Sequence, residues 1–471
     1  MNSDTKRYSA GPLVLYELNE VPWRVIDWYL ARRPESTLND ILAHSHTYTP
    51  VTKDEGELHP WSTWPTVHRG VYNSTHRILF LNQDRAEASP YPPIWEIAAE
   101  AGLSVGVFGS LQSYPPDPAS PFAFYIPDTF APGPETIPKS YEPFQRINLR
   151  QTKQDGAVAS KVKLKGSLLI DVAKLKFIGV SFRTFWRIVS QLANEKRNAL
   201  YRTRRPIMQA PIAFDVFTHA LATTQPDFCT FFTNHVAGIM HRYWRYAFPE
   251  DFKFTLKEPK DFFHQQSLLV AMDLVDEHLT YLRDYVDKRN GQLLIASSMG
   301  QEAVERDYHG ELRITDEVAF VRALDFDGRV KWHLAMQPDF NFEFQTIEDA
   351  VDFSARLGRV ITNDGQLVFF RRRLAGKTLN AGLGNPSDVL ENERLFFVRD
   401  DGSRKRLNLQ EAGIQRIWRD VGTGYHQPQG LLVWYAKDKR PSGDRDEIES
   451  IAIAPMILQS LGISHRANAR D

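Results

Sequence analysis

Five short apolar runs, each ending in polar or turn-forming residues, constrain the fold of this chain more than any other feature. The runs are rich in Leu, Val, Ile and Phe and are well separated along the chain. They occupy residues 13–16, 104–108, 228–232, 293–296 and 431–435. Apolar runs of this length between turn signals are typical of strands that are buried on both faces of a sheet.

Helical patterns lie between these runs, at residues 21–32, 92–100 and 267–286. This alternation predicts an α/β fold, with a mostly parallel sheet between helical layers. Ligands of such sheets bind just outside the carboxyl ends of the strands. The polar residues expected at or just beyond those ends are Asn19, Asn234, Ser298 and His426. We therefore expect these four side chains to line one cleft.

The composition is that of one large globular protein. The chain has 471 residues, 42% of them hydrophobic, and a formal net charge of -1. This charge gives no reason to expect a nucleic-acid partner. The single cysteine, Cys229, excludes an intramolecular disulfide, and neither a signal peptide nor a run long enough to span a bilayer is recognisable. We expect one cytoplasmic domain over residues 1–471, without a transmembrane segment.

Three regions depart from the strand and helix alternation. Residues 112–150 are rich in proline and aromatic residues, which indicates an ordered irregular excursion. Residues 151–206 are basic and helical in pattern, and we expect an insertion or cap there. Such a segment either contacts an anionic substrate or a membrane surface, or is a solvated helical cap. Residues 302–425 are expected to form an inserted lobe with short strands, for example at 330–336 and 365–371.

Several segments carry recognisable landmarks, and they occur in a fixed order. The first is an apolar strand that breaks at Asn19 and is followed by Trp23. The second is Trp64-Pro65-Thr66-Val67-His68-Arg69-Gly70 with a downstream His76. The others span residues 230–244, 293–301, 424–433 and 453–462. Together they resemble the alkaline phosphatase superfamily, in its type I phosphodiesterase/nucleotide pyrophosphatase and sulfatase-like members, and indicate a divergent branch of it.

The resemblance implies a metal site in which several ligands have been replaced. In the family, two divalent metals are held by three Asp and three His around a Thr or Ser nucleophile. Here the Asp positions fall on Asn19, Asn234 and Ser298, and one His position falls on Met299. Neutral ligands do not offset the repulsion between two dications. We therefore expect a reduced site that holds one divalent metal, with zinc as the first candidate.

The residues that remain provide a ligand set for one metal. The imidazoles of His241 and His426, with His235 as a further candidate, suit zinc, and Asn234 would be a weak oxygen donor. Glu17 and Glu20 flank the turn at Asn19 and would restore negative charge to the cleft. The alternative is that His241 is simply a packed side chain within an aromatic stretch.

The nucleophile position of the family falls on Pro65, which has no hydroxyl. Hydroxyl groups lie nearby on Thr66, Ser62 and Thr63. Imidazoles flank the segment at His59 and His68, so a metal-free route in which a histidine activates a hydroxyl is a second possibility. Gln301 and His309 are expected near the cleft edge, as polar contacts to a substrate or as ordinary loop residues.

Two classes of function follow. The first is a hydrolase or transferase that acts on a phosphate ester, a phosphodiester foremost and a sulfate ester less readily, with a small anionic or phosphorylated substrate. The second is a catalytically silent relative that binds an anionic ligand or partner. The oligomeric state cannot be inferred from the sequence.

Overall fold

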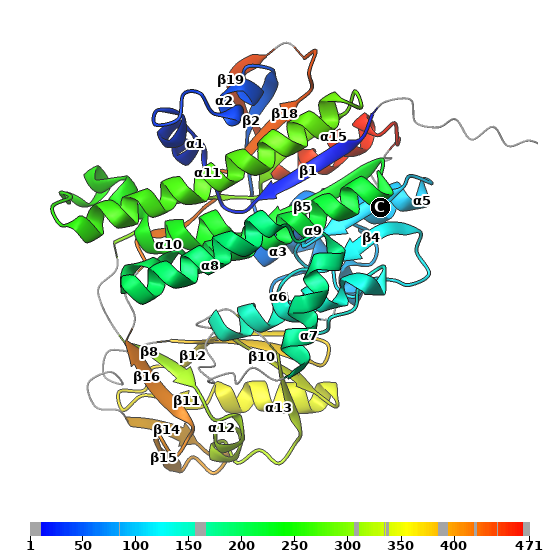
Figure 1. Ribbon diagram of the computed structural model, residues 1–471. Helices are drawn as coiled ribbons and strands as arrows, with labels where there is room; N and C mark the ends of the chain where they lie inside the picture. Colours follow the sequence, from blue (N-terminus) through cyan, green and yellow to red (C-terminus); the bar gives the residue numbers. More distant parts are fainter. Residues whose placement is uncertain are drawn as a thin grey trace, which may run out of the picture.

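The computed structural model describes residues 11–83, 85–155, 166–305, 310–333, 335, 339–384, 394–418, 422–439 and 441–464. Its centre is an eight-stranded sheet in the order β19-β2-β18-β6-β1-β5-β3-β4 (Figure 1). The bounds are β1 (Leu13–Leu18), β2 (Ser45–Val51), β3 (Val105–Phe108), β4 (Phe122–Ile126), β5 (Phe228–Thr233), β6 (Gln292–Ser297), β18 (Leu431–Tyr435) and β19 (Ser442–Glu449). Within this sheet β18 alone runs antiparallel to its neighbours, β2 and β6. The predicted mostly parallel α/β fold is confirmed.

The central strand β1 shows why these residues form a buried sheet. It pairs in parallel with β5 on one side and β6 on the other. Successive side chains point to opposite faces, so Leu13 and Leu15 enter one hydrophobic core while Val14 and Tyr16 enter the other. Because both faces are covered, nearly every residue of the strand is apolar.

Helices cover both faces of the sheet. One face is packed by the helices α1 (Trp23–Leu30), α2 (Thr37–Leu42), α6 (Glu142–Asp155), α9 (Gln209–Thr224), α10 (His235–Ala247) and α11 (Pro259–Asp287). The other is packed by α3 (Pro60–Arg69), α5 (Ile94–Glu100) and α15 (Ile453–Ser460). The predicted helices at 21–32, 92–100 and 267–286 correspond to α1, α5 and part of α11.

The region at 112–150 contains more regular structure than its composition indicates. The strand β4 lies at the edge of the sheet beside β3, and α6 follows it. The connections around them are rich in proline and aromatic residues. For this reason the strand β4 was not predicted from the sequence. The region is ordered, as expected, but it is less irregular than the expectation, because it contains β4 and most of α6.

The basic segment is helical and contributes to the main core. Its described part contains α7 (Gly166–Lys174), η3 (Leu175–Ile178), α8 (Phe182–Arg197) and η4 (Ala199–Met208). Leu175, Ile178 and Ile207 belong to the core that α9, α10 and α11 form against the sheet. This segment is therefore packed onto the protein along part of its length.

A separate hydrophobic core lies in the chain between Leu312 and Ile414. It is built on a four-stranded sheet in the order β12-β13-β10-β9 and two smaller sheets, and it forms the lower part of Figure 1. Its elements are β8 (Gly310–Ile314), α12 (Glu317–Ala323), β9 (Val330–His333), β10 (Asp339–Phe344), α13 (Ile347–Leu357), β11 (Val360–Ile361), β12 (Phe369–Ala375), β13 (Thr378–Leu383), β14 (Arg394–Val398), β15 (Arg404–Asn408) and β16 (Ile414–Trp418). We refer to this part as the lobe.

A two-stranded ribbon joins the lobe to the central sheet. It consists of β7 (Gly300–Ala303), which follows β6, and β17 (Gly424–Gln427), which precedes β18. In its register His426 lies opposite Gln301. Among the described residues, no helix has the length and apolar content needed to cross a membrane.

Candidate functional site

The turn after β1 places a buried carboxylate at the carboxyl ends of the strands. Glu20 has a left-handed backbone, with φ 61°, and this conformation turns the chain sharply between β1 and α1. The backbone N–H of Asn19 donates to the carbonyl of Thr233 at the end of β5, at 3.1 Å, which anchors the turn. Glu20 is only 3% exposed.

Two histidines from distant parts of the chain meet this carboxylate. His241 comes from α10, and its Nε2 lies 2.8 Å from Glu20 Oε2. His426 comes from β17, and its Nε2 lies 3.4 Å from the same oxygen. One ligand atom of each residue lies within 4.8 Å of the others. We call Glu20, His241 and His426 the Glu-His-His group.

The surroundings of the Glu-His-His group orient its ligand atoms. His241 Nδ1 donates to the Gly424 carbonyl at 3.0 Å, which turns Nε2 toward Glu20. Gln301 of β7 donates from Nε2 to Glu20 Oε2. A carboxylate oxygen and two imidazole nitrogens, one of them held by a backbone carbonyl, are a donor set that suits a single zinc-like dication. The residues therefore fit one divalent metal.

The electrostatics of Glu20 agree with a charged carboxylate. Burial acts to raise its pKa, but His426 and His241 outweigh burial and hold the pKa well below its usual range. An ionised carboxylate in a buried position needs cationic partners. A divalent metal bound to the Glu-His-His group would be such a partner.

The amides of Asn19 and Asn234 lie beside this group. Asn19 Nδ2 donates to Asn234 Oδ1 at 2.7 Å and to Glu20 Oε1 at 2.9 Å. Trp64 Nε1 donates to Asn19 Oδ1 at 2.8 Å. The Asn19 amide is thus fully used, while Asn234 is exposed at the start of α10. The structure brings Asn19, Asn234 and His426 into one cluster around Glu20.

Ser298 lies at the end of β6 and contacts α3. Its hydroxyl shares a hydrogen bond with Thr63, with the oxygens 2.8 Å apart, and both side chains are fully buried. The neighbouring Met299 is also buried. The Ser298 and Thr63 hydroxyls thus satisfy each other within the protein.

Thr66 lies on α3 in a separate buried network. Its hydroxyl donates to Asp54, at 2.7 Å to one oxygen and 2.8 Å to the other, and lies 3.0 Å from His76 Nε2. His76 Nδ1 accepts from the Ile78 backbone N–H, so Nε2 carries the proton and donates to Thr66. Burial lowers the pKa of His76 to about 3 and raises that of Asp54. Ser62, one turn earlier, accepts from Asn73.

Two predicted site residues pair with each other in the core. His68 Nε2 lies 2.7 Å from Glu17 Oε1, and both residues are fully buried. The His68 ring packs on Trp64 and Trp95. Glu17 points to the α3 side of the sheet because it shares a face with Leu15, whereas Glu20 lies beyond the strand. Only Glu20 of the two acids reaches the histidines of the Glu-His-His group.

His235 uses both ring nitrogens elsewhere. Nε2 donates to the Ala271 carbonyl of α11 at 3.0 Å, and Nδ1 accepts from the Thr233 hydroxyl at 2.7 Å. Burial lowers its pKa to about 4. His235 is a packed, neutral side chain between α10 and α11. The remaining predicted residue, His309, lies outside the described residues.

His59 borders the Glu-His-His group together with residues that the sequence did not single out. Its ring stacks on Trp61, with centroids 4.3 Å apart, and meets His426 at 5.8 Å. Glu57 Oε2 lies 3.7 Å from His59 Nε2. Glu57 also accepts from the Tyr425 hydroxyl and, at 2.7 Å, from Arg371 of the lobe strand β12. These contacts connect the lobe with the residues around the site.

Little in the sequence indicated that three residues, Glu57, Tyr425 and Arg371, would lie near the site. Glu57 lies two residues before His59 and Tyr425 immediately before His426, so proximity to a landmark was the available signal. Arg371 begins the run Arg371-Arg372-Arg373, which reads as an ordinary charged strand face.

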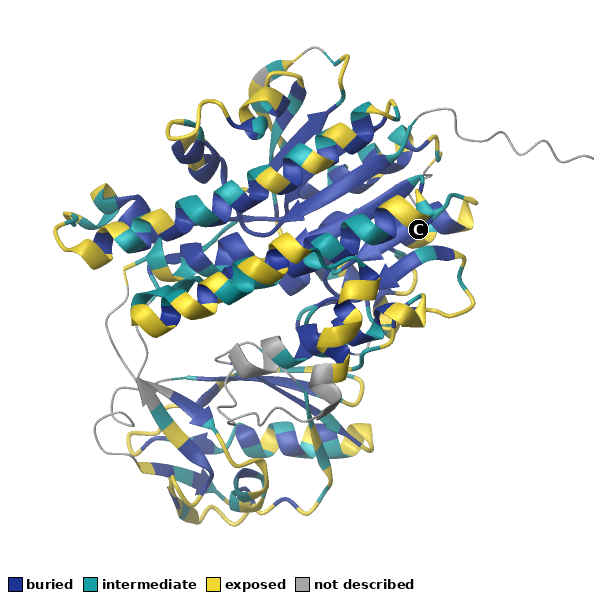
Figure 2. Cartoon of the chain, in the orientation of Figure 1, coloured by how far each residue is buried: buried dark blue, intermediate teal, exposed yellow. Residues whose placement is uncertain are grey.

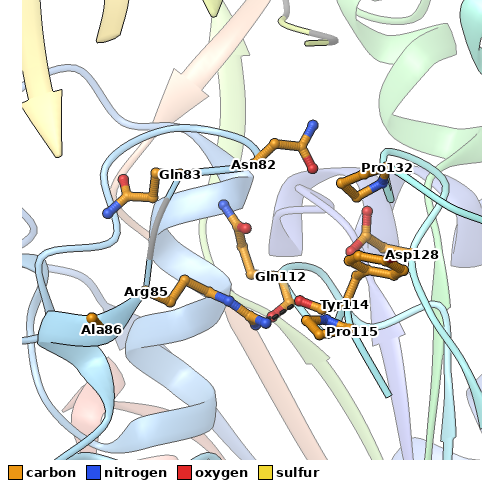
Figure 3. Close-up of a pocket in the computed structure, with 9 residues that line it drawn as sticks. All are labelled: Asn82, Gln83, Arg85, Ala86, Gln112, Tyr114, Pro115, Asp128 and Pro132. Atoms are coloured by element: carbon orange, nitrogen blue, oxygen red, sulfur yellow. Dashed lines mark hydrogen bonds between the residues drawn. The ribbon is translucent and has the colours of Figure 1, made fainter. Parts of the chain in front are cut away.

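A pocket of about 370 Å³ lies away from the Glu-His-His group (Figure 3). Its lining residues are Asn82, Gln83, Arg85, Ala86, Gln112, Tyr114, Pro115, Asp128 and Pro132. The Arg85 guanidinium donates to the backbone carbonyls of Gln112 and Tyr114. Burial raises the pKa of Asp128 to about 6. Two of the Arg85 hydrogen bonds are thus made to backbone carbonyls of the pocket's own lining.

No family model matches the chain, and no curated protein matches it in sequence. Solved structures with a similar chain path include murine ectonucleotide pyrophosphatase/phosphodiesterase 5, at 11% identity and a TM-score of 0.42, over 96% of this chain and 95% of that chain. Phosphonoacetate hydrolase from Sinorhizobium meliloti has 10% identity and a TM-score of 0.42, over 96% of each chain. Thermus thermophilus alkaline phosphatase has 13% identity and a TM-score of 0.42, over 98% of this chain and 93% of that chain.

At TM-scores below 0.5, such likenesses concern the path of the chain alone. What the site does has to be judged from its own residues.

Proposed function

We propose that the protein is a phosphoester hydrolase, with phosphodiesters as its preferred substrate class, that works with one divalent metal. The observation that carries this proposal is the Glu-His-His group, whose three ligand atoms lie within 4.8 Å of one another at the carboxyl ends of the strands. Ligand sites in parallel sheets lie at that edge. A divalent metal supplies Lewis-acid polarisation of a phosphoryl oxygen and lowers the pKa of a nucleophile.

One metal rather than two follows from the charges. A second dication a few ångströms away would need further carboxylates. The positions that would provide them carry Asn19, Asn234 and Ser298, which make neutral hydrogen bonds with protein partners. Zinc is the metal that we propose, since two imidazoles and one carboxylate are typical of it.

The residues of this chain would bind and orient an anionic substrate around the metal. Asn234 is exposed beside the Glu-His-His group and offers an amide to a phosphoryl oxygen. His59 and Tyr425 lie on the other side of His426. Water is the nucleophile that fits this arrangement best, because the Thr63 and Thr66 hydroxyls are buried in hydrogen bonds to Ser298 and Asp54. Thr66, Ser62, Thr63 and His68 remain catalytic candidates only if the protein opens.

The test combines metal content with turnover. Zinc-loaded protein is dialysed and its metal content measured by elemental analysis, and hydrolysis of a chromogenic phosphodiester is compared with that of the corresponding monoester and sulfate. We expect one equivalent of zinc. Glu20→Gln, His241→Ala and His426→Ala should each lose the metal, and turnover should fall about a thousandfold or more.

The matched control is His44→Ala, which removes an exposed histidine that does not belong to the Glu-His-His group. It should change neither the zinc content nor the turnover. A second tightly held equivalent of zinc would contradict the one-metal site. Equal turnover in the wild type and in His426→Ala would contradict its role in hydrolysis.

The burial of the hydroxyls also favours a second candidate, a silent relative that binds an anionic ligand. Within the described residues, neither Thr63 nor Thr66 has a hydrogen bond to the Glu-His-His group. Calorimetry with a phosphodiester analogue separates the two candidates. Metal-dependent binding without any turnover would identify the binder.

A further inference from the structure

The helix α8 has its apolar face on the outside. Phe182, Phe185, Trp186 and Leu192 are exposed by 72%, 52%, 53% and 48%. The face that packs against the protein instead buries the polar side chains of Thr184, Gln191 and Glu195. A surface helix ordinarily places its apolar stripe against the core. Here the spacing of three and four residues puts that stripe outward (Figure 2).

The inward polar face is held by specific hydrogen bonds, so this orientation is built into the helix. Gln191 Nε2 donates to the Tyr201 carbonyl of η4 at 2.6 Å and to Glu195 Oε1 at 3.0 Å. Glu195 also accepts from Arg205 of η4. Rotating the helix to bury its aromatic side chains would break these contacts.

The exposed aromatic side chains form one patch. Phe182, Phe185 and Trp186 contact one another, with ring centroids 5.7 to 6.3 Å apart. Phe177, in the preceding turn η3, is 78% exposed. We call Phe182, Phe185 and Trp186 the aromatic patch. Contiguous exposed apolar side chains of this kind mark interaction surfaces.

The segment around the aromatic patch is strongly basic. Residues 166–208 contain nine Lys or Arg and two Asp or Glu, whereas the whole chain has 57 and 58. Both acids are already paired, Asp171 with Arg146 and Glu195 with Arg205. Lys174 and Lys176 are exposed immediately before Phe177.

Cations also lie on the same helix face as the aromatic side chains. Lys196 and Arg197 are exposed near the end of α8, eleven residues or more beyond Phe185, which is about three helical turns. Glu277 of α11 pairs with Arg183 and Arg187 at the flank of the patch. The outward face therefore carries aromatic rings near the start of α8 and the exposed cations Lys196 and Arg197 near its end.

We propose that the aromatic patch docks this protein on an anionic lipid bilayer. Aromatic side chains on one face of a helix with Lys and Arg around them are typical of interfacial helices, which insert the rings at the headgroup boundary. Lysines beside the patch attract anionic headgroups, with each cation adding to the binding. The same lysines disfavour a protein partner, because Lys is depleted in protein interfaces.

The experiment is flotation of the full-length protein with vesicles. Vesicles of phosphatidylcholine alone are compared with vesicles that contain about a third phosphatidylserine, at about 0.1 M salt, where charges are screened over about 10 Å, and at higher salt. We expect binding to the anionic vesicles only, weakened by salt. The triple variant Phe182→Ser/Phe185→Ser/Trp186→Ser should reduce it at least tenfold.

The matched control is Val318→Ser/Ile347→Ser, which removes two apolar side chains of the lobe that are 67% and 52% exposed. It should bind like the wild type. A second variant, Lys174→Gln/Lys176→Gln, leaves the aromatic rings in place and should weaken binding to anionic vesicles. Unchanged circular dichroism and unfolding midpoint establish that each variant is folded.

Three outcomes would overturn the proposal. They are absence of binding to anionic vesicles, binding that the triple variant leaves intact, and equal binding to neutral vesicles. A dimer in light scattering that the triple variant dissociates would assign the aromatic patch to a second copy of this chain instead.

Discussion

The negative charge of the Glu-His-His group is carried by a single carboxylate, that of Glu20. Neutral side chains stand at the ends of three strands, and Asn19, Asn234 and Ser298 satisfy their hydrogen bonds with one another or with Trp64 and Thr63. Glu20 remains as the acid that meets two imidazoles. A neutral shell around one carboxylate suits one dication and opposes a second.

A substitution of the single residue Thr66 tests whether its hydroxyl is structural or catalytic. Thr66→Val keeps the shape of the side chain but removes the Thr66 donor from Asp54, which keeps the Asn73 backbone N–H, and leaves His76 Nε2 without its hydrogen-bond partner. An unsatisfied buried polar group costs about 1–3 kcal/mol. We expect the free energy of unfolding in urea to fall by that amount, with turnover per folded molecule largely kept. A stable Thr66→Val protein without turnover would identify Thr66 as the nucleophile.

Among the elements, the strand β12 of the lobe contacts the loop before α3 through one arginine. Arg371 donates to Glu57 at 2.7 Å and also to Asp339 of β10. Asp339 is 4% exposed and accepts a further bond from Asn380. Glu57 in turn lies beside His59, next to His426. The pair between Arg371 and the partly exposed Glu57 thus joins the lobe to the surroundings of the Glu-His-His group, whereas the pair between Arg371 and Asp339 is buried within the lobe.

Removing this arginine should be costly. Arg371→Met leaves the Asp339 carboxylate buried without its cation, and breaking a buried pair from one side costs about 3–5 kcal/mol. The control Arg399→Met removes a more exposed pair with Asp325, for which about 0–1 kcal/mol is expected. The loss in the free energy of unfolding is to be measured for both variants by urea unfolding. Equal losses for the two variants would show that the buried Asp339 does not depend on Arg371 as its cation.

For the whole molecule, buried neutral histidines make stability depend on pH. The pKa of His235 is lowered to about 4 and that of His76 to about 3, both by burial. An unfolded chain binds a proton to each histidine below a pKa of about 6.5. Between those values the unfolded state holds more protons, so the free energy of unfolding falls as the pH falls.

One variant isolates the contribution of His235 to this pH dependence of the free energy of unfolding. Asp128, whose pKa is raised to about 6, acts in the opposite direction as the pH falls, so the wild-type slope is a sum. His235→Gln removes one proton uptake. Between about pH 4.5 and pH 6, its slope of unfolding free energy against pH should be lower than in the wild type by about 1.4 kcal/mol per unit. An identical slope would mean that His235 is not held neutral by burial.

The path of the main sheet could be predicted from the sequence because its signal is local. An apolar run such as 13–16 or 293–296 identifies a buried strand from its own residues, and the helices between such runs imply parallel pairing. The strands β2 and β19 were missed because they lack that signal: β2 is polar and contains Pro50, and β19 is mostly charged. The turn at Asn19 and the retained His241 and His426 were also recognisable from the landmarks.

The partners of each side chain were decided by tertiary structure alone. Glu17 and Glu20 are three residues apart and look alike in sequence, yet one pairs with His68 in the core and the other with His241 and His426. The burial of Thr66 and the outward aromatic face of α8 are equally invisible in the local pattern. Composition and periodicity report which residues form an element. Which face of it meets which neighbour depends on contacts between residues that can lie hundreds of positions apart, as Glu20 and His426 do.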